Sequence, residues 1–199
     1  MLTKLDAARR QLGVAFDLYI HDRDPVSVQC LACGAGEILD SLAEQAGTEP
    51  FSAHILETRP ELNIPKIKTI RNQFWNAFKH ATTRGSAIRD DTELLEAFSD
   101  EQNDGALFIG WHDYSQITGR LPISAQVFQV WYQVLADGGH RMNPGADMVG
   151  AHGVFPRLIA LSRKEQKRRL ARAITKYQND RKLLRDLKTE TQPLVANAP

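Results

Sequence analysis

The sequence is poor in cysteine and has no long uncharged apolar segment. Its 199 residues include two cysteines, Cys30 and Cys33, which are too few for the disulfide framework of a small secreted domain. No run approaches the roughly 18 consecutive apolar residues that indicate a transmembrane helix. The charged N-terminus is followed by no apolar signal region. These absences predict a cytoplasmic chain that does not enter a membrane.

Repeats, phosphate-binding glycine loops and paired metal motifs are also missing. The glycines match no phosphate-loop pattern, and no second cysteine pair completes a zinc site with Cys30 and Cys33. There is no Glu-x-x-His pair of the kind that holds two metal ions in helical bundles. We therefore expect no metal and no cofactor, and we interpret the two cysteines as inert buried thiols.

The formal charge of the chain is +1, but the charges are unevenly distributed. Residues 1–161 hold 14 Lys or Arg and 20 Asp or Glu, whereas residues 162–199 hold 11 and 4. An acidic body therefore precedes a basic C-terminal segment. Such a segment is often a solvated helix, but it also suits contact with a polyanion or with the acidic body of a second copy.

Apolar residues recur at spacings of three and four along most of the chain, which is typical of amphipathic helices. We predict an all-α fold, a bundle of six or seven helices followed by a long basic helix. Residues 105–118 also fit a strand opening at Phe108, but the spacing of Leu107, Trp111 and Tyr114 favours a helix. The expected helices cover residues 3–20, 25–46, 64–83, 91–98, 105–118, 122–137 and 162–189.

Local signals mark several helix ends. Thr3 with Asp6, and Ser162 with Glu165, resemble capping boxes. Asp24 is a good N-cap, and the proline after it suits the first helical position. These signals lead us to predict three parts: a helical bundle domain at 1–161, a basic C-terminal helix at 162–190 and a disordered tail at 191–199.

The second expected helix contains Gly34 and Gly36, although glycine inside a helix costs up to about 1 kcal/mol relative to alanine. Such a cost is tolerated where a neighbouring helix needs room. We therefore expect a close helix crossing at these two glycines.

The helix expected at 64–83 has one apolar face and one polar flank. A neutral His80 beside Lys79 fits acid–base chemistry on a phosphodiester, in which a cation stabilises the phosphate charge. The catalytic candidates on this flank are His80, Lys79, Asn76 and Arg71. The alternative is structural, with Asn76 and His80 satisfying backbone or loop groups in a polar layer of the bundle.

Three short segments resemble a family of uncharacterised bacterial all-helical proteins. They are Lys4–Arg9, Asp24–Ser27 and Phe78–Ala81, the last within an Asn-x-x-Lys-His-Ala motif. This resemblance covers roughly the first two fifths of the chain and implies no known activity.

The α-helical pattern of an arginine and a polar residue followed by a histidine is also distantly similar to the motif of the HEPN superfamily. Many HEPN proteins are metal-independent endoribonucleases that pair two copies around a composite site. The resemblance places the motif arginine on Arg71, its polar neighbour on Asn72 and the histidine on His80. Eight residues separate Arg71 from His80, more than in the family motif, and nine helical positions turn them to opposite sides. The arginine of such a site would therefore come from elsewhere or from a second copy, which makes a homodimer the expected partner.

Many of the cations of the basic C-terminal helix lie in its first turns, although the helix dipole disfavours each cation there by about 0.3–1 kcal/mol. A nearby anionic partner would offset this cost, and Arg with Lys suits phosphates. A solvated or self-docking helix and a dimer arm are the alternatives. The candidate nucleic-acid-binding residues are Arg163, Lys164, Lys167, Arg168, Arg169 and Arg172.

Two further groups of polar residues each have two interpretations, a metal site or an ordinary structural role. Glu37 and Asp40 lie on the second helix, where they fit a metal site together with His80 or a buried polar pair with Lys79 or His80. The weakly patterned loop at 138–153 fits a flexible lid or disorder. It contains His140, Asp147 and His152.

The sequence thus predicts one of two function classes. The first is an RNA-processing or toxin-like endoribonuclease of HEPN type in which His80 is the acid or base. The second is a non-catalytic helical binding module whose basic C-terminal helix contacts RNA, another polyanion or a partner protein.

Overall fold

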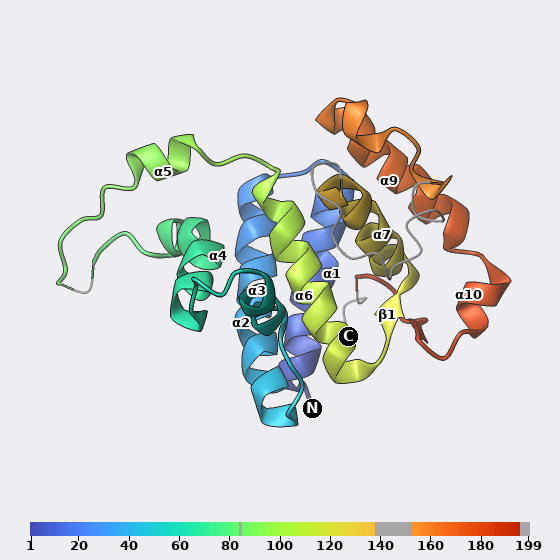
Figure 1. The fold of residues 1–199 in the computed structure, drawn as a ribbon, viewed down its shortest axis with the longest axis horizontal. Helices are drawn as coiled ribbons and strands as arrows, with labels where there is room; N and C mark the ends of the chain where they lie inside the picture. Colours follow the sequence, from blue (N-terminus) through green and yellow to red (C-terminus); the bar gives the residue numbers. More distant parts are fainter. Residues whose placement is uncertain (84, 138–152, 196–199) are drawn as a thin grey trace.

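The computed structural model describes residues 1–83, 85–137 and 153–195. Helices dominate these ranges, which confirms the predicted all-α class (Figure 1). The first six helices are α1 (Lys4–Ile20), α2 (Pro25–Ala46), α3 (Phe51–Thr58), α4 (Ile64–Lys79), α5 (Thr92–Glu96) and α6 (Gln102–Thr118). The later elements are β1 (Leu121–Pro122), α7 (Ile123–Asp137), the 3₁₀ helix η1 (Leu158–Ala160), α9 (Arg163–Tyr177), α10 (Arg181–Arg185) and β2 (Thr189–Glu190).

The first two helices begin where their capping signals predict. The Thr3 hydroxyl accepts from the Asp6 amide while the Asp6 carboxylate accepts from the Thr3 amide, so the capping box is complete. Asp24 accepts hydrogen bonds from the amides of Val26 and Ser27 at the start of α2. At Ser162, by contrast, the side chain makes no capping hydrogen bond, although α9 begins at the predicted residue.

The core lies where α1, α2, α6 and α7 pack together, with α9 across α7 and α1 (Figure 1). Large aromatic side chains fill it because each buries a large apolar area. The Trp131 indole N–H donates to the carbonyl of Gln166 at 3.1 Å, which joins α7 to α9. The fully buried aromatic residues are Phe16, Tyr19, Trp111, Phe128, Trp131 and Phe155.

The closest approaches between segments occur at glycines other than those predicted. A Cβ on Gly110 would lie 2.6 Å from a Leu12 methyl, so α6 needs a glycine to pack on α1. A Cβ on Gly13 would collide with the carbonyl of Leu194, so α1 needs one to accept the C-terminal tail. The expectation of a close crossing is wrong at Gly36, where a Cβ would meet nothing within 4 Å, whereas a Cβ on Gly34 would lie 3.4 Å from the side-chain oxygen of Gln11 in α1.

The 48–63 segment and the end of α4 differ from expectation. The helix α3 forms within this segment, where the list of expected helices has none, and the Asp113 carboxylate in α6 accepts the amide of Phe51 at its start. The α4 helix ends at Lys79 rather than 83, because residues 81–83 and 85–89 form their own backbone hydrogen bonds, including Arg89 N–H to Ala81 C=O at 3.1 Å. This excursion and α5 extend away from the core in Figure 1.

The predicted basic helix at 162–190 is not continuous. It is divided into α9 and α10 because the Asp180 carboxylate accepts the amides of Lys182 and Leu183 and so starts a new helix. Beyond α10, Thr189–Glu190 pairs in parallel with Leu121–Pro122. The C-terminus therefore turns back onto the body.

The predicted disordered tail at 191–199 is docked over residues 191–195, and 196–199 lie outside the described residues. Arg9 in α1 donates to the carbonyls of Pro193 and Leu194 at 3.1 and 2.9 Å and pairs with Glu190. The Tyr114 hydroxyl donates to the same Glu190 carboxylate at 2.7 Å. These charge-assisted contacts hold the tail against α1 and α6.

By length and composition α2 could cross a membrane, and it is the one such helix among the described residues. Half of its most apolar window is buried inside the protein, against α1 and α6. Core helices pass the same test, so this helix by itself does not indicate a membrane protein.

Candidate nucleic-acid interface

Arg163, the first residue of α9, turns inward rather than toward solvent. Its guanidinium donates to both oxygens of Asp104, at 2.8 and 2.5 Å, and to Asp100 at 2.8 Å. The Tyr19 hydroxyl donates to the same Asp104 carboxylate at 2.5 Å. Burial raises the pKa of Asp104 above its usual 3.8, while Arg163 acts to lower it. Arg163 is thus the counter-ion of a buried carboxylate.

Lys167, one turn later, also points into the protein. It is 4% exposed, and its ammonium donates to Asp22 at 2.7 Å and to Asp100 at 3.2 Å. The same ammonium lies 4.5 Å from the centre of the Tyr19 ring.

Arg163 and Lys167 therefore correct our expectation of a free set of six phosphate-binding residues. The anionic partner inferred from the crowded first turns exists, but it is the Asp22, Asp100 and Asp104 carboxylates of the same chain. These carboxylates offset the unfavourable interaction of the two cations with the dipole of α9.

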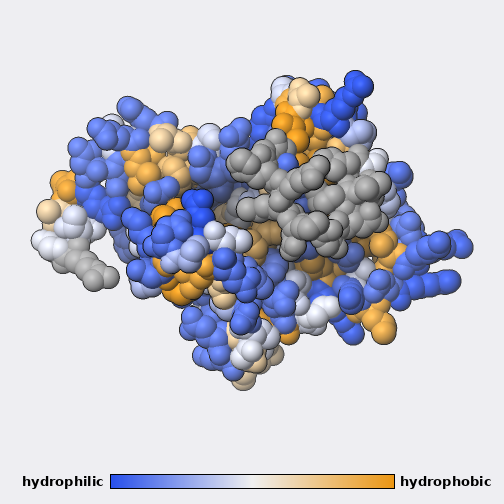
Figure 2. All heavy atoms as spheres, in the orientation of Figure 1, coloured by the Kyte–Doolittle hydropathy of each residue, from blue (hydrophilic) through white to orange (hydrophobic). Residues whose placement is uncertain are grey.

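Apart from Arg169, the other cations of α9 and α10 are exposed, as is Lys188 just after α10. In Figure 2 hydrophilic side chains project at the edge where Figure 1 places these two helices. Within residues 163–188 one acidic residue, Asp186, is exposed. We call the exposed cations the basic face: Lys164, Arg168, Arg172, Lys176, Arg181, Lys182, Arg185 and Lys188.

Local carboxylates neutralise the basic face only weakly. Glu165 lies 3.7 Å from both Arg168 and Arg172, and such surface pairs are worth about 0–1 kcal/mol. Arg169, predicted to bind nucleic acid, is half-buried and donates to the Pro156 carbonyl at 2.7 Å. Of the six predicted residues, Lys164, Arg168 and Arg172 thus remain exposed.

A cavity of about 450 Å³ lies beside the basic face. Residues 153–155 form one wall, and α9 forms the other with Arg169, Arg172, Lys176 and Tyr177. The Lys176 ammonium lies 5.1 Å from the centre of the Tyr177 ring. Cations beside an aromatic ring are the combination that single-stranded nucleic-acid sites use for phosphates and bases.

The predicted catalytic flank of α4 ends at an exposed histidine. His80 is the C-cap of α4, and its amide donates to the Asn76 carbonyl at 3.1 Å. Lys79 is also exposed, and its ammonium lies 4.1 Å from the centre of the Trp75 ring. His80 is thus reachable from water, as an acid or base must be, but it lines neither of the two cavities described for this chain.

Arg71 lies elsewhere on α4 and faces α2. It donates to both oxygens of Asp40, at 3.2 and 2.5 Å, and to Asn72 at 3.3 Å. Asn72 is buried and donates to Glu37 at 3.2 Å. Burial acts to lower the pKa of Arg71, but the hydrogen bonds with Asp40 raise it above its usual value, so the side chain stays charged.

The structure therefore does not bring Arg71 and His80 together. Nine helical positions correspond to roughly 13 Å along the axis. Arg71 and Asn72 instead join α4 to α2 through their side-chain hydrogen bonds with Asp40 and Glu37. The carboxylates of Glu37 and Asp40 pair with them rather than with Lys79 or His80.

The two cysteines lie inside α2, as their neighbours predict. Cys33 is buried and Cys30 half-buried, and both are free thiols. Burial raises the pKa of Cys33 to about 12, so the reactive thiolate is scarce at neutral pH. The Gln29 side-chain amide donates to the Cys33 sulfur at 3.2 Å.

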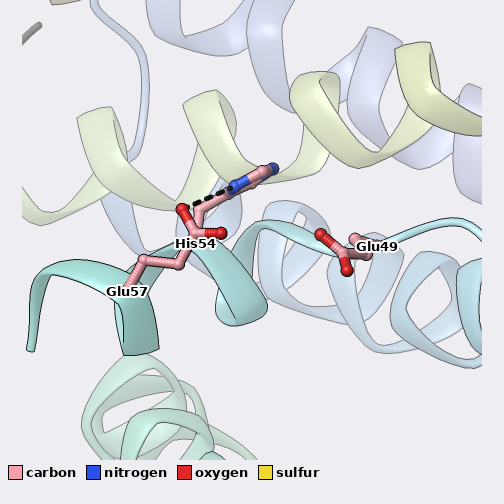
Figure 3. A group of neighbouring side chains, drawn as sticks. All are labelled: Glu49, His54 and Glu57. Carbon is pink, nitrogen blue, oxygen red and sulfur yellow. Dashed lines mark ion pairs between the residues drawn. The ribbon is translucent and has the colours of Figure 1, made fainter. Parts of the chain in front are cut away.

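Figure 3 shows three possible metal ligands that the sequence pattern did not reveal, Glu49, His54 and Glu57, around the start of α3. Their ligand atoms lie within 4.8 Å of one another, and His54 pairs with Glu57 at 3.6 Å. Both carboxylates are exposed, so the group also fits an ordinary surface ion pair. The other metal candidates, His140, Asp147 and His152, lie outside the described residues, as does most of the 138–153 loop.

Comparison of the chain with protein-family models, with curated proteins and with solved structures finds no match. The resemblance to bacterial helical proteins and to the HEPN superfamily therefore stays a prediction.

Proposed function

We propose that this chain is a non-catalytic helical module that binds nucleic acid, RNA in the first instance, through the basic face of α9 and α10. In this proposal α1, α2, α6, α7 and α9 form one bundle domain, and the basic face is its binding surface. The observation that carries the proposal is the presence of eight exposed cations with one exposed carboxylate over residues 163–188.

The segregation of charge supports this assignment. Arg163 and Lys167 are held in ion pairs inside the fold, whereas the cations on the basic face have at most weak ion pairs within the described residues. Phosphate binding by such side chains releases condensed counterions, which provides affinity without base recognition. The Tyr177 ring in the neighbouring cavity offers a surface for base stacking.

The enzymatic alternative has weaker support. Arg71 is held by Asp40, so it is not free to stabilise a phosphate near His80. A HEPN-type site would need a cation from a second copy. The endoribonuclease is therefore the less supported of the two candidate functions.

The proposal is tested by fluorescence anisotropy with a short labelled single-stranded RNA over a series of KCl concentrations. The test variant carries Lys164→Gln, Arg168→Gln and Arg172→Gln, which leave the buried ion pairs intact. Each lost phosphate contact should reduce the slope of log K against log salt by about 0.7. Loss of all three contacts therefore weakens binding by roughly 100-fold near 0.1 M salt.

The matched control removes three exposed cations elsewhere, with Lys4→Gln, Arg10→Gln and Lys66→Gln. It has the same net charge as the test variant and should bind almost as tightly as wild type. Equal binding by the two variants, or binding that does not depend on salt, would refute the basic face as the site.

The same incubation separates the two function classes. The binding module leaves the RNA at full length. RNA cleavage by wild type that disappears in His80→Ala would instead establish the enzyme and overturn the non-catalytic proposal.

A further inference from the structure

A second cavity, of about 330 Å³, lies on the side of the molecule away from the basic face, among α2, α3, α4 and α6. Its walls are mostly aliphatic and aromatic, which suits an apolar occupant. The apolar side chains that line it are Ile55, Leu62, Ile67, Ile70, Phe74 and Ile109. This volume is at the lower end of the range typical of small-molecule sites, about 300–1,000 Å³.

Two buried polar atoms belong to residues that line this cavity. Gln29 and Ser52 are each 2% exposed, and both contribute to the lining. The side-chain oxygen of Gln29 and the hydroxyl of Ser52 have no hydrogen-bond partner within the described residues. A buried polar group without a partner is unfavourable, so a ligand that enters the cavity and supplies the missing partner is favoured.

The hydrogen-bonding capacity of these groups defines the head of a ligand. The Gln29 amide nitrogen already donates to the Cys33 sulfur, which leaves the amide oxygen as an acceptor. The Ser52 hydroxyl can donate or accept. A matching head group therefore donates a hydrogen bond to Gln29 and either accepts one from Ser52 or donates one to it, as a hydroxyl or a secondary amine or amide does.

The cavity wall carries no unpaired charge among the described residues, which favours a neutral ligand. Arg71 is the one charged residue that lines the cavity in the described part of the chain, and Asp40 neutralises it through two hydrogen bonds. A carboxylate ligand would lose its hydration without meeting an unpaired cation.

We propose that the α2–α3–α4–α6 cavity binds a small, neutral, mainly apolar molecule whose polar head bonds to Gln29 and Ser52. Access is from the side of Ile70, which lines the cavity and is 47% exposed. This site is independent of the nucleic-acid proposal, because the two share no residue. The chain would then be a module that carries a ligand site and a polyanion surface on different helices.

The test uses N-phenyl-1-naphthylamine, a neutral apolar fluorophore with one N–H group. Wild type should bind it saturably at one site with increased emission. Ile70→Trp places a large ring at the mouth and should weaken binding by at least about tenfold, because the cavity is near the lower size limit. The matched control is Ile88→Trp, which adds the same ring at a residue that is 88% exposed and outside the cavity, and which should bind as wild type does.

Gln29→Met tests the polar contact with little change in side-chain size. It removes the acceptor and should weaken binding of the fluorophore by roughly threefold to tenfold, the value of a neutral hydrogen bond. The N-methylated fluorophore has no N–H, so Gln29→Met should leave its affinity unchanged. This comparison also keeps the proposal testable if Ile70→Trp does not fold, which circular dichroism would reveal.

Competition tests the neutral head group. Octanol should displace the fluorophore at lower concentration than octanoate does. Stronger displacement by octanoate would overturn the neutral-ligand assignment. Emission that never saturates, or equal binding by wild type and a folded Ile70→Trp, would overturn the site itself.

Discussion

Replacement of Arg163 by methionine tests whether the first cation of α9 stabilises the fold. Methionine retains much of the apolar stem and favours a helix, but it has no charge. The Asp104 carboxylate, in a residue that is 9% exposed, would lose its ion pair and keep only the Tyr19 hydroxyl as a hydrogen-bond partner within the described residues. Breaking a buried pair in this way costs about 3–5 kcal/mol, because one charge remains buried without compensation.

This loss should be visible in equilibrium unfolding followed by far-ultraviolet circular dichroism. For a chain of 199 residues it corresponds to a fall in Tm of roughly 6–20 °C. The neighbouring exposed cation is the matched control, and Lys164→Met should change stability by less than about 0.5 kcal/mol.

A second substitution identifies the cause of the loss. Asp104→Asn removes the buried charge and keeps an acceptor for Tyr19, so adding it to Arg163→Met should restore about half of the lost stability. The deficit of Arg163→Met should also be smallest below pH 3.8, where Asp104 is protonated in both states, and grow as pH rises through its elevated native-state pKa. If Arg163→Met is as stable as Lys164→Met, our account of this buried network is incorrect.

Two further predictions concern the tail and the start of α2. Gly13→Ala should displace the carbonyl of Leu194 and break its bond with Arg9, so proteolysis should release the C-terminal residues faster than in wild type; equal cleavage rates would contradict the docked tail. Hydrogen bonds from Ser27 hold the pKa of Asp24 below its usual 3.8, so this cap stabilises the fold above that pH and is lost as pH falls through the lowered pKa. Asp24→Asn caps without titrating, so its urea midpoint should fall less than that of wild type between about pH 5 and pH 2; parallel curves would rule out this role for Asp24.

Interactions between residues a few positions apart in the sequence determined most of the secondary structure. The Thr3 capping box, the Asp24–Pro25 start and the apolar periodicity act over a few positions, so α1, α2, α6 and α7 begin and end close to the predicted residues. The all-α class follows from the same short-range signals. The break between α9 and α10 is also local, since Asp180 caps the second helix, but the pattern of cations obscured it.

The roles of the charged residues were decided only by the tertiary structure. Arg163 and Lys167 look like Lys164 and Arg168 in the sequence, yet Arg163 meets a carboxylate 59 positions away, and Arg9 meets one 181 positions away. Helix periodicity predicts on which face of a helix a side chain lies, but not which other helix packs against that face. The ion pairs that remove cations from the basic face, and the cavity that joins Gln29 to Ser52, therefore arise only when distant helices pack together.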